Sequence, residues 1–465
     1  MRNKIINVAM LVLIFLVFIL ITGYNRLNAM EFLPKPKKVI SEKTGIIIDS
    51  STKLVTSELF EKRFPSAISR GKETLSKFPK GNRDVTIRVA LSNEISQDLI
   101  PEQLKSVIKK PEAYWVKIKD KEIQIIGPDF MGALHGLTTV EYLLQKNSGR
   151  IAEGVILDWP DLKIRAFHLI LRNGVKFEEA KEFLAKLRYG HYNTLVLEIE
   201  NWVKLDSMKE LVTHKDAWSK EQFVEFVNYA RVLGLEVIPE IKLLTHQEKL
   251  LKDKYPNLMY NMSTYDPGKE GVYKIIFHIL DELISLIKPK AIHIGHDEVA
   301  GYNEKSRQKW LIEGEKMLPA ELFLKDIFRI HDYLKSKNVE VWMWGDMLIG
   351  KEEFPQMSQR HLHGNADYIA IRPKIPKDIV ICDWHYSDKQ KNFPSSKLFA
   401  ELDHKVLGAT WHKEETIKNF SRYIANLPKN GEGMIATSWY SVKNKGWGII
   451  EEIAAKSAEA FWNAK

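Results

Sequence analysis

The sequence predicts an α/β protein in which a (β/α)8 TIM barrel follows a small α+β accessory domain. Eight short apolar runs recur after about residue 160, and stretches with helical periodicity separate them. The runs lack polar alternation, which is typical of parallel strands that are buried on both faces. The chain has 465 residues, of which 45% are hydrophobic and 28% charged, so it is long enough for two domains with a large core.

The first 29 residues predict an export signal rather than a part of the fold. Arg2 and Lys4 precede a chargeless run over residues 5–25, and residues 27–29 (LNA) fit a cleavage site. The apolar core of about 18 residues is also long enough to remain as a membrane anchor, so cleavage stays open. Positive charge before the span places the rest of the protein outside. We therefore expect an exported protein, secreted or anchored on the outer face of the cytoplasmic membrane.

Residues 31–155 are predicted to form the accessory domain. Alternating residues at 114–118 and 122–126 indicate a hairpin that turns at 119–121, and a helix is expected over 132–145. No linker rich in glycine or serine follows this region, so we expect the two domains to pack together.

Residues 160–465 are predicted to form the barrel. The eight expected strands are 164–171, 194–199, 235–240, 291–295, 339–344, 378–383, 405–410 and 433–438. Apolar residues spaced by three and four positions predict helices between the strands, including 178–187, 221–233, 273–287 and 321–334. A last helix over 451–465 closes the barrel.

Acidic and aromatic residues gather where these strands end, and the active site of a TIM barrel lies at the carboxyl ends of its strands. They are Glu198, Glu200, Trp202, Glu240, His246, Asp297, Glu298, Trp344, Asp346, Asp383, Trp384, Tyr386, Trp411, Trp439 and Tyr440. Aromatic faces among carboxylates suit a sugar, whose C–H face stacks while its hydroxyls form hydrogen bonds. His293 and Asp297 are loosely possible metal ligands, but no metal-binding motif supports them, so no metal is expected.

Asp297 and Glu298 are the strongest candidates for catalysis. Neighbouring residues on a strand face opposite ways, so both reach one pocket only where the strand gives way to a loop, and Gly295 fits such a break. Adjacent carboxylates disfavour each other's ionisation, so one can keep its proton near neutrality and act as an acid. Sequence neighbours are poorly placed to flank a bond as a usual retaining pair does, at about 5 Å. A substrate-assisted reaction, in which the sugar's own 2-acetamido oxygen attacks, removes this difficulty.

These residues carry a family resemblance. AIHIGHDEV (291–299) resembles the H-x-G-G-D-E signature of glycoside hydrolase family 20, the β-N-acetylhexosaminidases. DWPDLKIRAFHL (158–169) resembles its D-x-P-x-x-x-x-R-G entry into the first barrel strand. LGLEVIPEIKLLTHQ (233–247) resembles its G-I-x-V-I-P-E-I-D-x-P-G-H motif, and the stretches DWHY and ATWHK resemble the divergent hexosaminidase D-type branch. The resemblance spans nearly all of the chain after the export signal.

The resemblance implies a role for each matching residue. Glu298 matches the general acid/base, and Asp297 matches the residue that orients the acetamido group. Arg165 matches an arginine that binds sugar hydroxyls, and His246 matches the histidine after the third strand. Trp344, Trp384 and Trp439 match the walls of the acetamido pocket, and Tyr386 is a candidate donor to the acetamido oxygen. Glu200, His296, Asp346 and Trp411 complete the candidate substrate-binding set; no metal or organic cofactor is implied.

Several positions depart from the family pattern. His296 stands where the signature has a second glycine, and it either packs behind the strand or alters the pocket floor. Ile170 replaces an aspartate, and residues 243–245 replace the proline–glycine approach to the histidine. LEIEN (197–201) replaces H-L-T-D-D, so that Glu198 or Glu200 is a substitute hydroxyl-binding acid. These changes keep the catalytic pair but leave the substrate and linkage open.

We therefore expect an exo-acting glycosidase that removes terminal β-linked N-acetylhexosamine with retention of configuration. One alternative is a carbohydrate-binding barrel without turnover. Another is a glycosidase for sugars that lack the acetamido group, with Glu200 or Glu240 as the nucleophile. The net charge of +9 fits an anionic cell-envelope glycan, or is a generic lysine-rich surface. No basic block or RNA motif indicates nucleic acid, and a lone cysteine, Cys382, excludes an internal disulfide.

Overall fold

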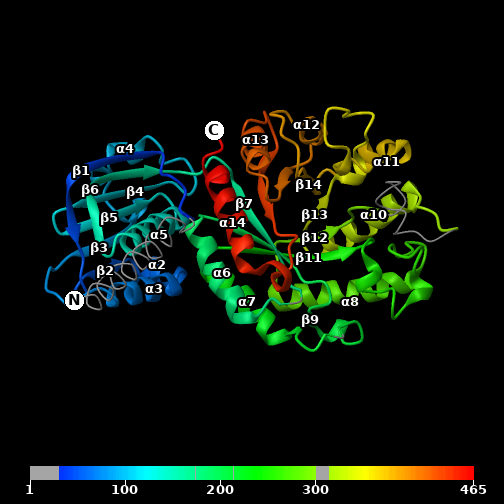
Figure 1. The fold of residues 1–465 in the computed structure, drawn as a ribbon, viewed down its shortest axis with the longest axis horizontal. Helices are drawn as coiled ribbons and strands as arrows, with labels where there is room; N and C mark the ends of the chain where they lie inside the picture. The colour runs from blue at the N-terminus through cyan, green and yellow to red at the C-terminus, as the bar shows by residue number, and fades with distance from the viewer. Residues whose placement is uncertain (1–30, 173, 213, 300–313) are drawn as a thin grey trace, which may run out of the picture.

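The computed structural model describes residues 31–465 except 173, 213 and 300–313, and it consists of two domains side by side (Figure 1). The predicted export signal, residues 1–29, lies outside the described residues. Within the described ranges, no helix is both long and apolar enough to cross a membrane.

The accessory domain is a six-stranded mixed sheet with the strand order β1-β6-β4-β5-β3-β2. Its strands are β1 (Lys38–Ile47), β2 (Lys53–Thr56), β3 (Thr86–Leu91), β4 (Tyr114–Lys119), β5 (Glu122–Gly127) and β6 (Arg150–Asp158). Its helices are α2 (Glu58–Arg63), α3 (Pro65–Ser76), α4 (Glu102–Lys105) and α5 (Phe130–Lys146). The predicted hairpin is confirmed, because β4 and β5 pair antiparallel up to the turn at Asp120, and α5 is the predicted helix.

The second domain is a closed eight-stranded parallel barrel, so the predicted TIM barrel is confirmed. Its strands are β7 (Ile164–Ile170), β8 (Thr194–Glu198), β11 (Glu236–Leu243), β12 (Ala291–Gly295), β13 (Glu340–Trp344), β14 (Val380–Trp384), β15 (Val406–Thr410) and β16 (Gly431–Thr437). Its helices are α6 (Phe177–Tyr189), α7 (Lys220–Val232), α8 (Glu270–Ile287), α10 (Ala320–Ser336), α11 (Ala366–Ile371), α12 (Pro394–Glu401), α13 (Glu414–Ala425) and α14 (Val442–Trp462). A short parallel pair, β9 (Val203–Lys204) and β10 (Trp218–Ser219), was not expected from the sequence.

The barrel strands are apolar on both faces because each face meets a different core. On β8, Val196 points into the barrel interior, where it joins a cluster that includes Trp344. Leu195 and Leu197 point outward and pack in the layer under the surrounding helices. This two-sided burial explains why the strand sequences show no polar alternation.

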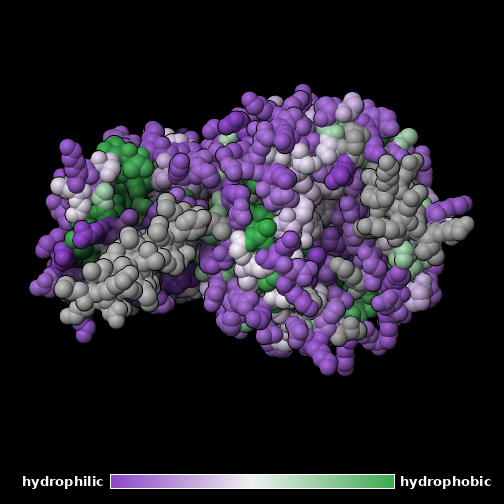
Figure 2. Space-filling model, viewed as in Figure 1, coloured by the Kyte–Doolittle hydropathy of each residue, from purple (hydrophilic) through white to green (hydrophobic). Residues whose placement is uncertain are grey.

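The two domains share buried contacts. Trp462, at the end of α14, packs in the core of the accessory domain, and its indole N–H donates to Asp158 (2.9 Å). The hydroxyl of Tyr114 donates to the same carboxylate (2.9 Å), and Arg188 pairs with the buried Glu141 (2.6 Å). Figure 2 shows a mainly hydrophilic face with a hydrophobic patch over the accessory domain, whose strand β1 carries the exposed Val39 and Ile40.

Candidate active site

A cavity of about 560 Å³ lies at the carboxyl end of the barrel, and residues following all eight strands line it. Nine of the predicted site residues are in its wall: Glu200, His246, Asp297, Glu298, Trp344, Trp384, Tyr386, Trp411 and Trp439. His412, which follows the seventh strand next to Trp411, also lines the cavity. The other lining residues were not predicted from the sequence; they are Arg172, Lys242, Arg360, His361, Ser387 and Lys413. Nine of the fifteen residues expected to gather at this end of the barrel therefore line a single pocket.

The loop after β12 brings the two neighbouring carboxylates into this pocket. Gly295, His296 and Glu298 adopt left-handed backbone conformations, with φ of +74°, +68° and +53°. Such values are uncommon for residues other than glycine and occur often at functional sites. The unusual backbone replaces strand alternation, so Asp297 and Glu298 both line the cavity.

Asp297 is buried and ionised. Its Oδ2 lies 3.3 Å from His246 Nε2 and 3.5 Å from Lys242 Nζ. Burial raises the pKa of Asp297, but Lys242 and His246 outweigh burial and hold the pKa well below its usual range. Among the described residues, Oδ1 has no hydrogen-bond partner although it is buried. Asp297 therefore offers a charged acceptor to whatever fills the pocket.

Glu298 has a different environment. Its side chain is 32% exposed, and its Oε2 lies 3.9 Å from His246 Nε2. Its backbone N–H donates to Asp346 Oδ2 (2.9 Å), and His363 Nδ1 donates to the same oxygen (2.7 Å). The predicted sugar ligand Asp346 thus lies behind the cavity wall, where it holds the backbone of Glu298 in place.

Aromatic side chains form the apolar wall of the pocket. Trp384 stacks on Tyr386 with ring centroids 4.9 Å apart, and Trp344 and Trp439 lie 6.1 Å apart. The indole N–H of Trp344 donates to Glu240 (3.2 Å), which fixes the plane of the ring. Burial raises the pKa of Tyr386 well above its usual value, so its hydroxyl stays protonated and can donate a hydrogen bond.

A buried ionic network centred on Lys242 lies beneath Asp297. Lys242 Nζ lies 3.8 Å from Glu198 and 4.0 Å from Glu240, and His168 Nε2 is 3.1 Å from both carboxylates. Burial alone would lower the pKa of Lys242, but the negative charges of Asp297, Glu198 and Glu240 outweigh burial. The pKa of Lys242 therefore lies well above its usual value, and the ammonium stays charged. Lys242 occupies the position at which the strand-three motif has an aspartate. This replacement of a negative by a positive side chain is the sequence signal that could have identified Lys242 as a site residue.

Arg165 does not lie in the site, so its predicted role in binding sugar hydroxyls is wrong. It is the second residue of β7, at the amino end of the barrel, and the site lies at the opposite end. Its buried guanidinium donates to the carbonyls of Leu162 and His191 and pairs with Glu112 of the accessory domain. Arg172, which follows the carboxyl end of β7, lines the cavity instead and lies 3.3 Å from Glu200.

His296 does not line the cavity, so its place among the predicted substrate-binding residues is wrong, and the alternative expectation, packing behind the strand, is the one that the structure shows. Its Nε2 lies 3.0 Å from Asp326 on α10, and its Nδ1 lies 3.0 Å from the carbonyl of Ile294. The side chain is fully buried and does not line the cavity. His296 is therefore a support of the β12 loop rather than a pocket floor.

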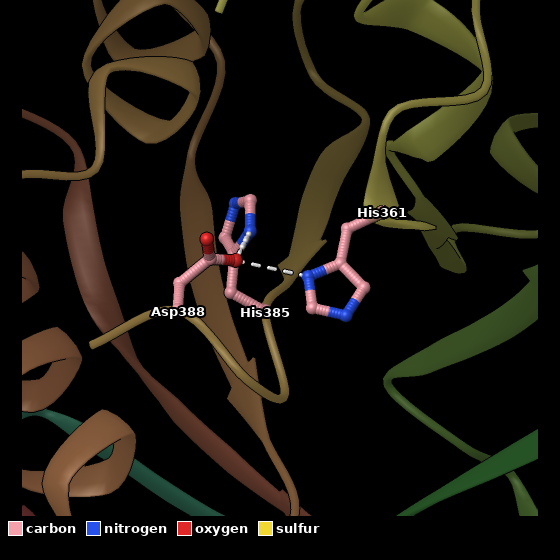
Figure 3. A group of neighbouring side chains, drawn as sticks. All are labelled: His361, His385 and Asp388. Carbon is pink, nitrogen blue, oxygen red and sulfur yellow. Dashed lines mark hydrogen bonds and ion pairs between the residues drawn. The ribbon is translucent and has the colours of Figure 1, made fainter. Parts of the chain in front are cut away.

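A second hydrogen-bonded group ties the loops after β13 and β14 together (Figure 3). Asp388 Oδ2 accepts from Nδ1 of both His361 and His385, at 3.0 Å each, and His385 Nε2 lies 3.0 Å from Ser395 Oγ. Burial lowers the pKa of His385, but Asp383 and Asp388 outweigh it and raise the pKa to about 9. The group holds the His361 ring 4.9 Å from Trp384 in the pocket wall.

Three groups of side chains in the described residues are spaced closely enough to hold a metal ion. They are His361, His385 and Asp388; His168, Glu198 and Glu240; and His246, Asp297 and Glu298. In the last two groups the ammonium of Lys242 lies within 4.0 Å of a carboxylate oxygen, and it would repel a metal ion. In the first, the shared carboxylate oxygen already accepts from both imidazoles. The absence of a metal stays a prediction.

Two models of one family match the chain: glycosyl hydrolase family 20, domain 2, over residues 29–159, and the catalytic domain of the same family over residues 193–395. Together they cover more than two thirds of the chain. The chain belongs to glycosyl hydrolase family 20. The resemblance of the stretches DWHY and ATWHK to the divergent hexosaminidase D-type branch stays a prediction.

Individual relatives are distant. A lacto-N-biosidase of Bifidobacterium bifidum is 24% identical over 65% of this chain and 28% of its own length. Beta-hexosaminidase subunit A2 of Dictyostelium discoideum is 24% identical over 75% of this chain and 68% of its own. The chain thus spans about a quarter of the first relative and two thirds of the second. The structure of a family 20 exo-β-N-acetylglucosaminidase from Vibrio harveyi, in complex with N-acetylglucosamine, superposes with a TM-score of 0.66 at 17% identity, over 94% of this chain and 74% of that one.

Proposed function

We propose that this family 20 member removes terminal β-linked N-acetylhexosamine from a glycan by a retaining, substrate-assisted reaction. The observation that carries the proposal is the unequal pair at the β12 loop. Asp297 is buried and ionised with one oxygen left without a hydrogen bond among the described residues, whereas Glu298 is a third exposed. An orienting acceptor and a proton donor that reaches the leaving group need these two environments.

In the proposed reaction the acetamido group of the sugar enters the aromatic pocket. Its N–H donates to Asp297 Oδ1, and the hydroxyl of Tyr386 donates to its carbonyl oxygen. That oxygen attacks C1, the C1–O glycosidic bond breaks, and Glu298 transfers its proton to the departing oxygen. Glu298 then removes a proton from water, which attacks C1, reopens the oxazolinium ring and leaves the product in the β configuration.

The remaining lining residues have complementary tasks. Arg172 and Glu200 form a 3.3 Å ion pair on the wall and offer donors and acceptors to sugar hydroxyls. Burial alone would lower the pKa of His246, but Asp297 outweighs it and raises the pKa, so His246 supports the charge of Asp297. Glu240 does not line the cavity, and its Oε1 accepts from the indole N–H of Trp344, which makes it a poor candidate for a protein nucleophile.

The relatives agree with this substrate class. They are hexosaminidases and a lacto-N-biosidase, and the neighbouring Vibrio harveyi structure holds N-acetylglucosamine. We also propose that the protein is exported, through residues 1–29, and that its substrate is a glycan of the cell envelope. The sequence pattern of those residues and the net charge of +9 support this location.

The direct test compares aryl β-N-acetylglucosaminide with aryl β-glucoside. Only the acetamido sugar should release the chromophore. Glu298→Gln should lower kcat/KM for N,N′-diacetylchitobiose by about 100-fold or more, because its leaving alcohol needs a proton. The loss should be smaller for a 2,4-dinitrophenyl leaving group, which needs none. Glu401→Gln, an exposed position on α12, is the matched control. Cleavage of the glucoside alone would overturn the mechanism, and tight binding without cleavage would favour the carbohydrate-binding alternative.

A further inference from the structure

The charges around the cavity fall into two layers. In the deep layer each acid has a basic neighbour: Glu200 pairs with Arg172 (3.3 Å), Asp297 with Lys242 (3.5 Å), and Glu298 with His246 (3.9 Å). This layer is close to neutral and suits an uncharged N-acetylhexosamine.

The outer layer, among the residues that the structure describes, has two basic side chains. Arg360, in a short 3-10 helix (Gln359–His361) between β13 and α11, and Lys413, directly before α13, are exposed side chains that line the same cavity. Across the part of the chain that the structure describes, neither forms an ion pair with an acid. Glu414, the neighbour of Lys413, is instead held by Lys418 at 2.6 Å. Within residues 31–299 and 314–465 as described, the mouth thus carries two positive charges with which no acidic side chain pairs.

The mouth also carries an aromatic platform next to Lys413. Trp411 packs against Tyr440 with centroids 4.7 Å apart and against His412 at 4.4 Å, and all three side chains are partly exposed. Trp411 and His412 line the cavity. A sugar ring that stacks on this platform would lie outside the deep pocket. In the proposed exo-acting reaction the terminal sugar fills the deep pocket, so a ring on the platform would belong to the leaving group.

We propose that the sugar on the leaving-group side carries an anionic substituent, a carboxylate or a sulfate ester, which Arg360 and Lys413 bind. This inference rests on the proposed glycosidase function and specifies its substrate class. Two cations at an exposed mouth lower the free energy of an anionic substrate at encounter and in the bound state. The terminal sugar remains neutral, because the deep charges are already matched.

The experiment measures kcat/KM for release of N-acetylglucosamine from three β1,4-linked disaccharides. They share the terminal N-acetylglucosamine and differ in the second sugar: N-acetylglucosamine, its 3-O-lactyl derivative (N-acetylmuramic acid), or its 6-sulfate. The readout is the ratio of each charged substrate to the neutral one. The test variant is Arg360→Gln/Lys413→Gln. The control, Lys274→Gln/Lys325→Gln, removes two exposed charges from α8 and α10 outside the cavity.

At low salt the ratio should be about five to ten for at least one charged substrate, as expected of two exposed ion pairs. It should fall to about one in the test variant, stay in the control, and shrink with added salt. A preference for the lactyl or the sulfated sugar alone identifies the anion. A wild-type ratio of one or less, or a preference that survives in the test variant, overturns the inference while leaving the glycosidase function standing. Failure to cleave any of the three, and aryl N-acetylglucosaminide as well, would instead overturn the proposed function itself.

Discussion

At the scale of single residues, the surroundings of Asp297 and Glu298 separate two chemically similar side chains. Sequence adjacency suggested that the two carboxylates set each other's ionisation. The structure shows that Lys242, 3.5 Å from Asp297, has the larger effect on that carboxyl group, together with His246. A buried cation in the third barrel strand therefore keeps the orienting residue charged.

Replacing Lys242 tests this role. Lys242→Met leaves Glu198, Glu240 and Asp297 without their shared ammonium, so the pKa of Asp297 rises. Because Asp297 acts as the ionised acceptor, activity should be lost at a higher pH on acidification. We expect kcat/KM to fall by about tenfold or more at neutral pH, with the acid limb of its pH profile displaced upward. Lys242→Arg should restore the position of that limb. A uniform loss with an unmoved limb would show that the lysine is only structural.

The two arginines of the first barrel strand provide a matched pair. Arg172→Met removes the partner of Glu200 in the cavity wall and should lower kcat/KM by about tenfold with little change in the free energy of unfolding. Arg165→Met leaves the carboxylate of Glu112 buried without its cation and should lower that free energy by about 3 kcal/mol, with kcat/KM unchanged in the folded enzyme. Urea denaturation and steady-state kinetics of both variants are the measurements. A fall in kcat/KM for Arg165→Met with an unchanged free energy of unfolding would contradict this assignment and indicate that Arg165 belongs to the site.

At the scale of the elements, loops rather than strands decide the shape of the pocket. The third strand shifts register between Glu240 and Leu243, where it pairs with β12, and Lys242 lies within this irregularity. The loops after β13 and β14 are joined through Asp388, which places His361 against Trp384. Neither feature has a local sequence signature, because each depends on residues that meet only in the closed barrel.

The loop connection predicts a pH dependence of stability. The pKa of His385 is about 9 in the fold, above the usual value of about 6.5. A raised pKa means that the stabilisation is complete below the unfolded value and is lost as pH rises through about 9. The free energy of unfolding should therefore fall between pH 7 and pH 9.5 by about 2 kcal/mol from this group. His385→Gln should flatten this part of the curve, measured by urea denaturation at each pH; an unchanged slope would contradict the assignment.

At the scale of the whole molecule, the accessory domain and the barrel behave as one packed unit. Trp462 of the last barrel helix is fully buried in the accessory core, and Glu112 of the accessory domain pairs with the buried Arg165. Burial raises the pKa of Glu112, but Arg165 outweighs it and lowers the pKa to about 2. Separating the domains would expose a tryptophan and leave buried charges without partners.

This packing predicts a single cooperative unfolding transition for the two domains together. Far-UV circular dichroism and tryptophan fluorescence should give the same midpoint in urea. Trp462→Ala should lower the urea midpoint for both probes alike. The free energy of unfolding should fall by about 3 kcal/mol, because both cores lose contacts. Two separate midpoints in the wild-type protein would contradict the shared-core description.

Much of the fold was predictable because each barrel strand is a short apolar run between amphipathic helices. All eight runs became strands within a few residues of the expected bounds. The site was predictable where residue type and strand end coincide, as for Glu298 and Trp439. Arg165 was misplaced because a motif match gives a position in the sequence but not the end of the strand that it occupies. Lys242 and His361 were missed because a lysine or a histidine acquires meaning only from its neighbours in space.

In the proposed reaction the acetamido oxygen of the substrate, and not a protein carboxylate, attacks C1. This attack is tested most directly by aryl glycosides whose N-acetyl group carries zero, one, two or three fluorine atoms, each of which withdraws electron density from that oxygen. We expect log kcat/KM to fall steadily across the series, by roughly tenfold per fluorine, because the attacking oxygen becomes a weaker nucleophile in the transition state. A rate independent of fluorination, in an enzyme that still cleaves the parent substrate, would contradict the proposed attack.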